Sequence, residues 1–430
     1  MDDESLHELF ARAIATEPPA GPMARNALRA GLRLRRRRRI EGATAGAAVV
    51  AAIAVTVPAL SGLLGTGGHQ PPAARKHGHG SVVYVANVNQ QPAGTLTPIS
   101  AATNKPGKPI KVGQAPDALA ATPNGKTVYV ADLGSNKVTP VATATGKAEK
   151  PIRVCAAPDM LAITPDGKTV YVACQGGNSR QPASVVPISA ATNTGGKPVV
   201  IGGHATRRNT AVGAIAIAPD GKTLYVAATL KGTVIPIDIA TNRPAKPIKV
   251  GRFPDGLAIT PDGKTIYVAN DGSGTVTPIS AATETAGTPI RVGAQPGDIA
   301  ITPDGKTAYV QGWTTVTPVN TATNTAGSPI SGVRSPWAMA FTPSGKTLYV
   351  TGYGVGEVTP ISTATNTAGK PIHVGRYPVA IAVTPDGRTA YVVNFVATGN
   401  GTVTPITTAT NTPGKPIKAG TGPRNLVIVP

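Results

Sequence analysis

Aromatic, sulfur-containing and acidic residues are all scarce in this chain. Phe, Trp and Tyr make up 4% of its 430 residues, and there are only two cysteines. A small scaffold held by many disulfides is therefore excluded. The core must be built from Val, Ile, Ala and Tyr. Lysine and arginine number 41 against 21 acidic residues, which gives a net charge of +20.

Motifs that carry familiar chemistry are missing as well. The chain has no Gly-x-Ser-x-Gly, no His-Glu-x-x-His, no phosphate loop and no dinucleotide fingerprint. We expect no catalytic residue, no metal and no cofactor. The basic charge would suit a nucleic acid, but the aromatic residues that stack on bases are sparse, so no nucleic-acid partner is expected.

One hairpin recurs along most of the sequence. In its clearest copy, Leu257-Ala-Ile259 and Ile266-Tyr-Val-Ala269 flank the turn Pro261-Asp-Gly-Lys264. Two β-prone runs around an Asp-Gly turn predict a tight hairpin, because Gly adopts the positive φ of such turns. The tyrosine of the second strand recurs at intervals of 40 to 54 residues, most often 42, which is the length of a four-stranded propeller blade. These tyrosines are Tyr84, Tyr129, Tyr171, Tyr225, Tyr267, Tyr309, Tyr349 and Tyr391.

The order of the strands predicts how the ring closes. Four classes of apolar segment each occur eight times, so we expect an all-β propeller of eight four-stranded blades. The repeats begin at Val82-Val-Tyr-Val-Ala86, a second strand, and end at Asn425-Leu-Val-Ile-Val429, a first strand. If the first strand is innermost, the C-terminal strand completes the blade begun by the N-terminal three, and no blade is left incomplete.

The repeats resemble the YVTN-type β-propeller proteins. The signature Tyr-Val-x-Asn occurs at Tyr84–Asn87, Tyr267–Asn270 and Tyr391–Asn394, after turns such as Thr260-Pro-Asp-Gly-Lys. The resemblance covers about residues 81–430. It implies an exported propeller, because relatives include surface-layer and YncE-like extracytoplasmic proteins, but it brings no shared catalytic residues. Seven blades are common in that family and are the alternative to the eight counted here.

The first eighty residues lack the repeat. Residues 1–40 are expected to form a cytoplasmic segment, which ends in six arginines between Arg33 and Arg39. Residues 41–64 include 22 residues without a charge, long enough to span a bilayer as a transmembrane helix. The adjacent arginines would hold the N-terminus inside. Residues 65–80 form a Gly/Pro/His linker, and residues 81–430 form the extracytoplasmic propeller. A cleaved signal peptide and secretion are the alternative.

The two faces of the predicted propeller differ. The hairpin turns and the twelve-residue loops between the third and fourth strands keep constant lengths, and we define their face as the bottom. Every change in length falls on the opposite face, the top, so the top loops are the expected ligand-binding elements. The candidate residues around the top of the central funnel are Asp117, Asp159, Arg252, Phe253, Asp255, Asp298, Trp313, Trp337, Arg376, Tyr377 and Arg424. The four aspartates are expected just before their innermost strands, and they could instead serve only to bond the backbone of their own turns.

Lysines mark the bottom face. The hairpin turns carry Lys126, Lys168, Lys222, Lys264, Lys306, Lys346 and Arg388. The strand that begins the propeller, Val82–Ala86, rises from this face, so the linker attaches here. The basic face is therefore expected to look toward anionic lipid headgroups. These charges could alternatively do no more than keep the turns solvated.

Cys155 and Cys174 are expected to be bonded to each other. Cys155 replaces a Gly that precedes most innermost strands, and Cys174 replaces the position of Asn270 in its blade. Both positions lie on the top of one blade, and an exported propeller lies outside the reducing cytoplasm. Two buried free thiols are the alternative.

These patterns favour a membrane-anchored, non-enzymatic binding or scaffold protein. A protein or an anionic envelope polymer would bind the top loops. The alternatives are a propeller lyase or hydrolase acting on a small molecule in the central funnel, and a transmembrane sensor.

Overall fold

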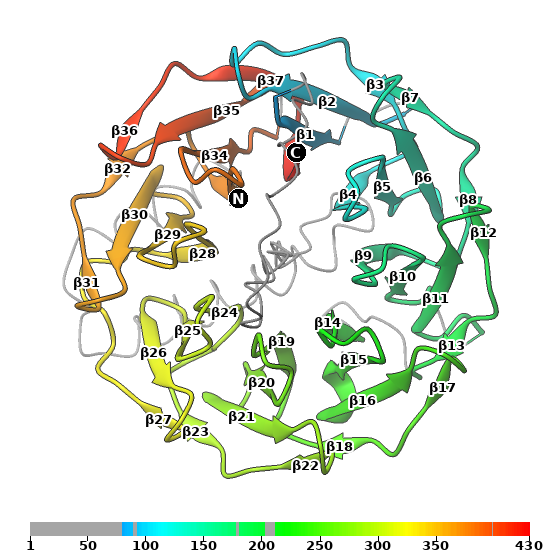
Figure 1. Ribbon diagram of the computed structural model, residues 1–430, viewed down its shortest axis with the longest axis vertical. Helices are drawn as coiled ribbons and strands as arrows, with labels where there is room; N and C mark the ends of the chain where they lie inside the picture. Colours follow the sequence, from blue (N-terminus) through cyan, green and yellow to red (C-terminus); the bar gives the residue numbers. More distant parts are fainter. Residues whose placement is uncertain (1–79, 89–92, 178–179, 203–210, 398) are drawn as a thin grey trace, which may run out of the picture.

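The computed structural model describes residues 80–88, 93–177, 180–202, 211–397 and 399–430. These residues form eight antiparallel β-sheets arranged as blades around a central axis (Figure 1). The predicted eight-bladed propeller is therefore confirmed. The cytoplasmic segment, the transmembrane helix and nearly all of the linker lie outside the described residues. Within the described part of the chain, no helix is long and apolar enough to cross a membrane.

The innermost strands surround the axis and neighbour one another in sequence order. Their bounds are β4 Pro116–Ala121, β9 Pro158–Ile163, β14 Val212–Ile217, β19 Pro254–Ile259, β24 Ile299–Ile301, β28 Pro336–Phe341, β33 Pro378–Val383 and β38 Pro423–Val429.

The second strands carry the repeated tyrosine and are buried on both sides. Their bounds are β1 Val82–Asn87, β5 Thr127–Asp132, β10 Thr169–Cys174, β15 Thr223–Ala228, β20 Thr265–Asn270, β25 Thr307–Gln311, β29 Thr347–Gly352 and β34 Thr389–Asn394.

The third strands run antiparallel to the second. Their bounds are β2 Thr95–Ser100, β6 Lys137–Ala142, β11 Ser184–Ser189, β16 Thr233–Asp238, β21 Thr275–Ser280, β26 Val316–Asn320, β30 Glu357–Ser362 and β35 Asn400–Thr407. A short 3₁₀ turn, η1 Thr229–Lys231, precedes β16.

The outer edge of a typical blade is split into two short strands, where the sequence predicted one. In blade 5, β22 and β23 both pair with β21. A proline between the two pieces, such as Pro289, lacks the N–H that a continuous ladder would need. The outer strands are β3 Ile110–Lys111, β7 Lys147–Ala148, β8 Ile152–Arg153, β12 Thr194–Gly195, β13 Val199–Val200, β17 Arg243–Pro244, β18 Ile248–Lys249, β22 Thr285–Ala286, β23 Ile290–Arg291, β27 Thr325–Ala326, β31 Thr367–Ala368, β32 Ile372–His373, β36 Thr412–Pro413 and β37 Ile417–Thr421.

The C-terminal strand closes the ring as the sequence predicts. In blade 1, β38 is the innermost strand and pairs with β1, followed outward by β2 and β3. Leu426 and Val429 of β38 are 3% and 4% exposed and belong to the apolar clusters on the two sides of this blade. Residues from both ends of the repeated region therefore build one blade.

The repeated tyrosines join neighbouring blades. The hydroxyl of Tyr267 in blade 5 donates to Asn324 Oδ1 in the bottom loop of blade 6, at 2.6 Å. Asn324 has a φ of +53°, a conformation that Asn tolerates better than most residues. The hydroxyl of Tyr391 donates in the same way to Asn104 Oδ1 at 2.7 Å, which ties blade 8 to blade 1. The tyrosine of the repeat is therefore a structural residue.

The hairpin turns pack against one another on the bottom face. In the Thr260–Lys264 turn, the Thr260 hydroxyl donates to Asp262 Oδ1 at 2.6 Å, and the same oxygen accepts the Lys264 N–H. Gly263 has a φ of +72°, and a Cβ built on it would lie 3.5 Å from the ring of Pro219 in the preceding turn. The constant Pro-Asp-Gly sequence therefore reflects the turn conformation and the contact between turns.

Candidate functional site

A β-bulge near the top of the innermost strands places the predicted candidates. In blade 5, Pro254 pairs with Asn270 and Gly256 with Ala269, so Asp255 has no partner in β20. The same irregularity occurs in every blade except the sixth. A bulge re-aims the side chain of its extra residue, and bulges are common beside active sites. The bulge residues are Asp117, Asp159, Gly213, Asp255, Trp337 with Ala338, Val379 and Arg424.

The position of three aspartates relative to their strands differs from the sequence prediction. Asp117, Asp159 and Asp255 were expected just before their strands, but they lie inside β4, β9 and β19. The strands begin earlier than expected, because the preceding prolines already take part in the pairing. Asp298 does precede its strand, β24.

Asp117 is a buried carboxylate in the bulge of blade 2. It is 4% exposed, and burial raises its pKa to about 7, although the positive charge of Arg424 opposes this shift. Its Oδ2 atom is buried without a hydrogen-bond partner among the described residues. The Nδ2 of Asn425 donates to the backbone carbonyl of Asp117 at 3.3 Å, which joins blade 1 to blade 2.

Asp159 is tied into the scaffold by a residue that the sequence interpretation did not single out. Gln175 Nε2 donates to Asp159 Oδ2 at 2.7 Å and to the carbonyl of Val212 in the next blade at 2.8 Å. Gln175 Oε1 in turn accepts the N–H of Ala211 at 2.8 Å. Asp159 is 2% exposed. Gln175 therefore links blade 3 to blade 4, and its position directly after Cys174 was the signal that could have revealed it.

Asp255 and Asp298 form an acidic pair on neighbouring blades. A Cβ on Gly256 would meet the carbonyl oxygen of Gly297 at 1.8 Å, so the two backbones approach each other closely. The pKa of Asp298 is raised to about 7, mainly by burial and in smaller part by the nearby charge of Asp255. The Ile299 N–H donates to Asp298 Oδ1 at 2.9 Å and opposes the shift. Asp298 thus partly serves its own turn, as the alternative interpretation expected.

An aromatic cluster lies on the next two blades. The rings of Trp337 and Tyr353 are stacked with their centroids 4.6 Å apart. Tyr353 also contacts Tyr377, with centroids 5.2 Å apart. In blades 8 and 1, the guanidinium of Arg424 lies 5.1 Å from the ring centroid of Phe395. Aromatic residues and a cation from three blades are therefore brought together at the top.

The remaining candidates lie in the loops around this region. Arg252 and Arg376 are exposed, whereas Phe253 and Trp313 are half-buried. The Arg252 guanidinium donates to the carbonyl of Gly272 at 2.9 Å, and the backbone N–H of Trp313 donates to the carbonyl of Ala294. We name as the top mouth the set Asp255, Asp298, Trp313, Trp337, Tyr353 and Tyr377, which blades 5 to 8 contribute consecutively.

Cys155 and Cys174 are joined by a disulfide, with their Cα atoms 5.8 Å apart. Cys174 is fully buried at the end of β10, and Cys155 lies in the segment that leads into β9. The bond therefore fastens the top of blade 3 beside Gln175 and Asp159.

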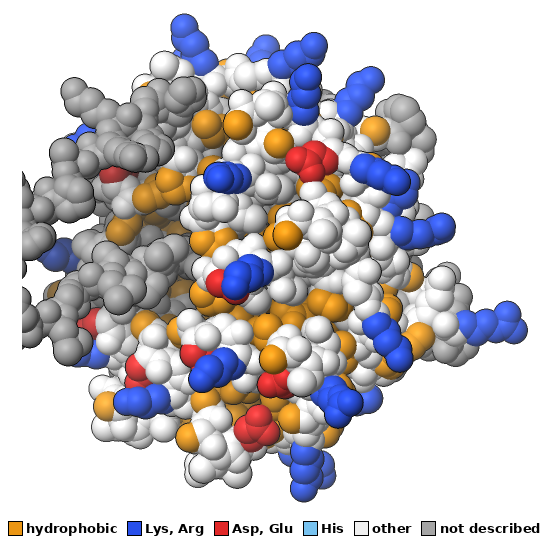
Figure 2. Space-filling model, turned by 45° about the vertical axis from the view of Figure 1, so that its right-hand side comes forward, with side chains coloured by type: hydrophobic (Ala, Val, Ile, Leu, Met, Phe, Trp, Pro, Cys, Tyr) orange, Lys and Arg blue, Asp and Glu red, His pale blue; other side chains and the backbone are white. Residues whose placement is uncertain are grey.

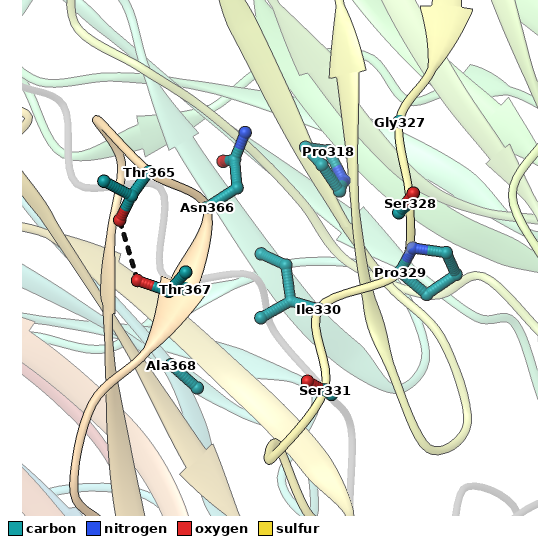
Figure 3. A pocket seen from close by; sticks show the side chains of 10 residues that line it. All are labelled: Pro318, Gly327, Ser328, Pro329, Ile330, Ser331, Thr365, Asn366, Thr367 and Ala368. Atoms are coloured by element: carbon teal, nitrogen blue, oxygen red, sulfur yellow. Dashed lines mark hydrogen bonds between the residues drawn. The ribbon is translucent and has the colours of Figure 1, made fainter.

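A separate hollow of about 390 Å³ lies at the outer edge, between blades 6 and 7 (Figure 3). It is lined by Pro318, Gly327–Ser331 and Thr365–Ala368, where the hydroxyls of Thr365 and Thr367 share a hydrogen bond of 2.7 Å. Its lining contains no ionisable side chain. Among the described residues, no group of three or more His, Cys, Asp or Glu side chains could hold a metal ion.

Comparison with known proteins relates part of the chain to an enzyme family. Residues 79–287, which run from blade 1 into blade 5, match a family model described as "Lactonase, 7-bladed beta-propeller". The chain is similar to that family in this region. Its eight blades exceed the seven in the description. No curated protein matches the chain.

Solved structures share the propeller architecture. One similar structure is a hydrazine synthase of Kuenenia stuttgartiensis, with 24% identity, a TM-score of 0.55, and coverage of 68% of this chain and 96% of that one. A second is the dihydro-heme d1 dehydrogenase NirN, with 16% identity, a TM-score of 0.67, and coverage of 80% and 74%. A third is a functionally unknown protein of Desulfotomaculum acetoxidans, with 18% identity, a TM-score of 0.54, and coverage of 67% and 94%. At these identities the likeness concerns the fold alone.

Proposed function

We propose that this propeller is a non-enzymatic binding protein that holds its partner at the top mouth. The main support is the bulge, which occupies one equivalent position in seven blades while the residue there changes from blade to blade. A constant scaffold with a variable ring of side chains is the usual design of a binding surface.

The chemistry of the top mouth favours a partner that presents a cation beside a flat apolar group. Asp255 supplies negative charge, Asp298 adds to it in its ionised form, and the adjoining Trp337–Tyr353–Tyr377 cluster supplies aromatic faces. A cation is attracted both by carboxylates and by aromatic faces. Of the two partners expected from the sequence, a protein segment with a basic side chain therefore fits better than an anionic polymer, which the acidic pair would repel.

The fluorescence of the protein offers a direct test, because Trp313 and Trp337 are its only tryptophans. Titration with the dipeptide acetyl-Phe-Arg-amide should change the tryptophan emission saturably, and acetyl-Phe-Glu-amide should not. Asp255→Asn and Asp298→Asn should each weaken the binding of the basic peptide about 5- to 10-fold, as for the loss of a partly screened charge pair. Glu284→Gln removes one acidic charge on the bottom and should leave binding unchanged. Equal binding of the two peptides would contradict the proposal.

Lactone hydrolysis is the second candidate. It is favoured by the family description and by two aspartates, Asp117 and Asp298, whose raised pKa values of about 7 suit a general base near neutral pH. Such a carboxylate would take a proton from a water that attacks the lactone carbonyl, and the ring oxygen would leave. Hydrolysis of δ-gluconolactone can be followed by acid release at constant pH. A rate equal to that of buffer, or one unchanged by both Asp117→Asn and Asp298→Asn, would reject this candidate.

We propose further that residues 1–40 are cytoplasmic, that residues 41–64 cross the membrane, and that the propeller is extracytoplasmic, with its bottom toward the anionic headgroups. The disulfide supports an oxidising location. The turn cations contribute less to membrane attraction than their number suggests, because several pair with their own turn aspartates. Lys168 and Lys264, for example, each lie 3.5 Å from such a carboxylate.

A further inference from the structure

A large positive charge lies on the outer edge of the propeller. The outer strands of blades 8, 1 and 2, with the loops leading into them, carry eight exposed cations. Over the same segments there is one carboxylate, Glu149, so the net charge is +7. We name this set the basic arc. It consists of Lys415, Lys418, Lys105, Lys108, Lys111, Lys147, Lys150 and Arg153.

The basic arc is continuous from blade to blade. The outer strand β37 of blade 8 lies against β2 of blade 1, β3 of blade 1 lies against β7 of blade 2, and β8 lies against β12 of blade 3. Within one edge, Lys105, Lys108 and Lys111 follow one another at three-residue intervals, roughly 10 Å apart in extended chain. Lys and Arg side chains project from much of the visible surface in Figure 2. A long ligand could thus contact cations of several blades at once.

Protection of the blade edges does not account for this distribution. Lysine and proline both hinder edge-to-edge pairing of sheets. Proline already occupies the same place in every outer edge, as Pro109, Pro289 and Pro329 illustrate. The edges of blades 5, 6 and 7 carry only Arg291 and Lys370 as Lys or Arg, in the segments that correspond to the basic arc. The outer edge of blade 4 is also basic, with Arg243, Lys246 and Lys249, but blade 3, which separates it from the basic arc, carries only Lys197. The fold therefore needs few charges at its rim, and the accumulation on blades 8, 1, 2 and 4 calls for another explanation.

The basic arc also differs from four of the seven bottom turns, in which the cation is paired with a carboxylate. The turn cations Lys168, Lys264, Lys306 and Arg388 lie within 4 Å of the aspartate in their own turn. Among the described residues, no ion pair includes a cation of the basic arc. The Oε2 atom of Glu149 instead accepts a hydrogen bond from Asn193 at 2.7 Å.

We propose that the basic arc binds a linear phosphodiester polymer of the cell envelope by charge. Seven of its eight cations are lysines, whose compact ammonium groups bind phosphate as point charges, whereas arginine forks suit bidentate contacts. The segments that carry the arc, 101–113, 143–155 and 408–421, contain no aromatic residue. Binding of single-stranded nucleic acid usually adds stacking of bases on aromatic rings, so the arc fits a polymer without bases. This site is independent of the top mouth.

Lysine footprinting of the full-length protein tests the location of the site. The protein is acetylated with a lysine-reactive ester, with and without long-chain inorganic polyphosphate as the probe, and each lysine is quantified by mass spectrometry. Lys105, Lys108, Lys111, Lys150, Lys415 and Lys418 should be protected. Lys264 and Lys306 should react as before. Because each lysine is read separately, the arginines at 33–39 do not obscure the result. Uniform protection, or none, would overturn the proposal.

Two matched variants test the energetics. Lys108→Gln/Lys111→Gln/Lys150→Gln should weaken polyphosphate binding about 10- to 100-fold at low salt and lower the salt slope by about 2 to 3, since each cation displaces close to one counterion. Lys222→Gln/Lys264→Gln/Lys306→Gln removes three charges from the bottom hairpin turns and should change binding less than about 3-fold. Equal losses in both variants would overturn the proposal.

Two competing polymers of equal total charge test the ligand class. Polygalacturonate should bind more weakly than polyphosphate, and oligothymidylate should bind no more tightly. Tighter binding of polygalacturonate would assign the arc to carboxylate polymers instead. Tighter binding of oligothymidylate would assign it to nucleic acid. Either result would overturn the proposal.

Discussion

The disulfide in blade 3 replaces a hydrogen-bonded tie that other blades keep. In blade 5, the Gly251 N–H donates to Asn270 Oδ1 at 3.1 Å, and a Cβ on Gly251 would lie 2.6 Å from Asn270 Cγ. Glycine is therefore required opposite the asparagine. Cys155 and Cys174 take these two places in blade 3. The double variant Cys155→Gly/Cys174→Asn, which introduces the residues of blade 5, should give a folded protein. The single variant Cys174→Asn should be less stable than the double variant.

The expected energies follow from the two kinds of tie. Closing the loop over a separation of 19 residues contributes about 3 kcal/mol in the chain-entropy model. The backbone hydrogen bond regained in Cys155→Gly/Cys174→Asn returns about 1 kcal/mol. In blade 5, Asn270 Nδ2 also donates to Thr277 at 2.9 Å, but the equivalent residue in blade 3 is Val186. The double variant should therefore lie about 2 kcal/mol below the oxidised protein, and adding Val186→Thr should return about 1 kcal/mol.

The single variant Cys174→Asn distinguishes this reasoning from a general loss of stability. It removes the disulfide and leaves the Cβ of Cys155 in the space that the asparagine needs, which should cost a further 1–3 kcal/mol or so. Thermal unfolding at a fixed scan rate, followed by intrinsic fluorescence, ranks the four proteins. If Cys174→Asn is as stable as Cys155→Gly/Cys174→Asn, the two positions do not share one space and the reasoning is refuted. Mass spectrometry of the unreduced protein should show no alkylated thiol.

Three further outcomes test closure and location. Tyr391→Phe should lower the free energy of unfolding by about 1 kcal/mol, measured by denaturant titration, because its hydroxyl ties blade 8 to Asn104. Deleting Asn425–Pro430 should expose the edge of β1 and cause aggregation visible by light scattering; a truncated protein that melts like the full chain would disprove closure. The full-length protein should stay in the membrane pellet after a high-salt wash with its N-terminus protected from external protease, and a soluble product starting near residues 65–80 would indicate cleavage instead.

The sequence predicted the ring because its information is repeated. Each copy of the hairpin turn and of the tyrosine strand supports the others, so seven turns and eight strands together predict one architecture. The phase difference between Val82 and Val429 likewise predicted the closing pair, since only antiparallel pairing of β38 with β1 completes a blade. The split of the outer strand was missed, because a two-residue strand leaves no pattern of alternation in the sequence.

The candidate site was harder to predict because its properties come from contacts between distant residues. Asp117 and Asp255 have the same place in the repeat, yet Asp117 is buried beside Arg424, which comes from the opposite end of the propeller sequence. Asp159 is fixed by Gln175, and that contact depends on the fold of blade 3 and on Val212 of blade 4. A repeat pattern places such residues on the correct face, but the burial of each one is set by its neighbouring blade.

Asp132 provides the last prediction, because it ends β5 at the position of Asn270 in β20. Asp132 is fully buried, and burial raises its pKa to about 7, although the Thr139 hydroxyl donates to it at 2.5 Å. The folded state therefore binds more protons than the unfolded state between about pH 4 and pH 7. Stability should fall as the pH rises through this window, by at most about 4 kcal/mol for this group.

Asp132→Asn should remove that part of the pH dependence. It should leave stability at pH 4 nearly unchanged and raise it at pH 8, because a neutral amide needs no proton to remain buried beside Gly113. Thermal unfolding between pH 4 and pH 8 measures the effect, and Asp220→Asn, in an exposed hairpin turn, is the matched control. The slope of the wild-type protein should exceed that of Asp132→Asn but equal that of Asp220→Asn, since Asp117 and Asp298 titrate in both variants. Equal slopes in all three proteins would show that Asp132 is already ionised at pH 4 in the folded state, and that its burial is compensated by the Thr139 and Gly113 hydrogen bonds.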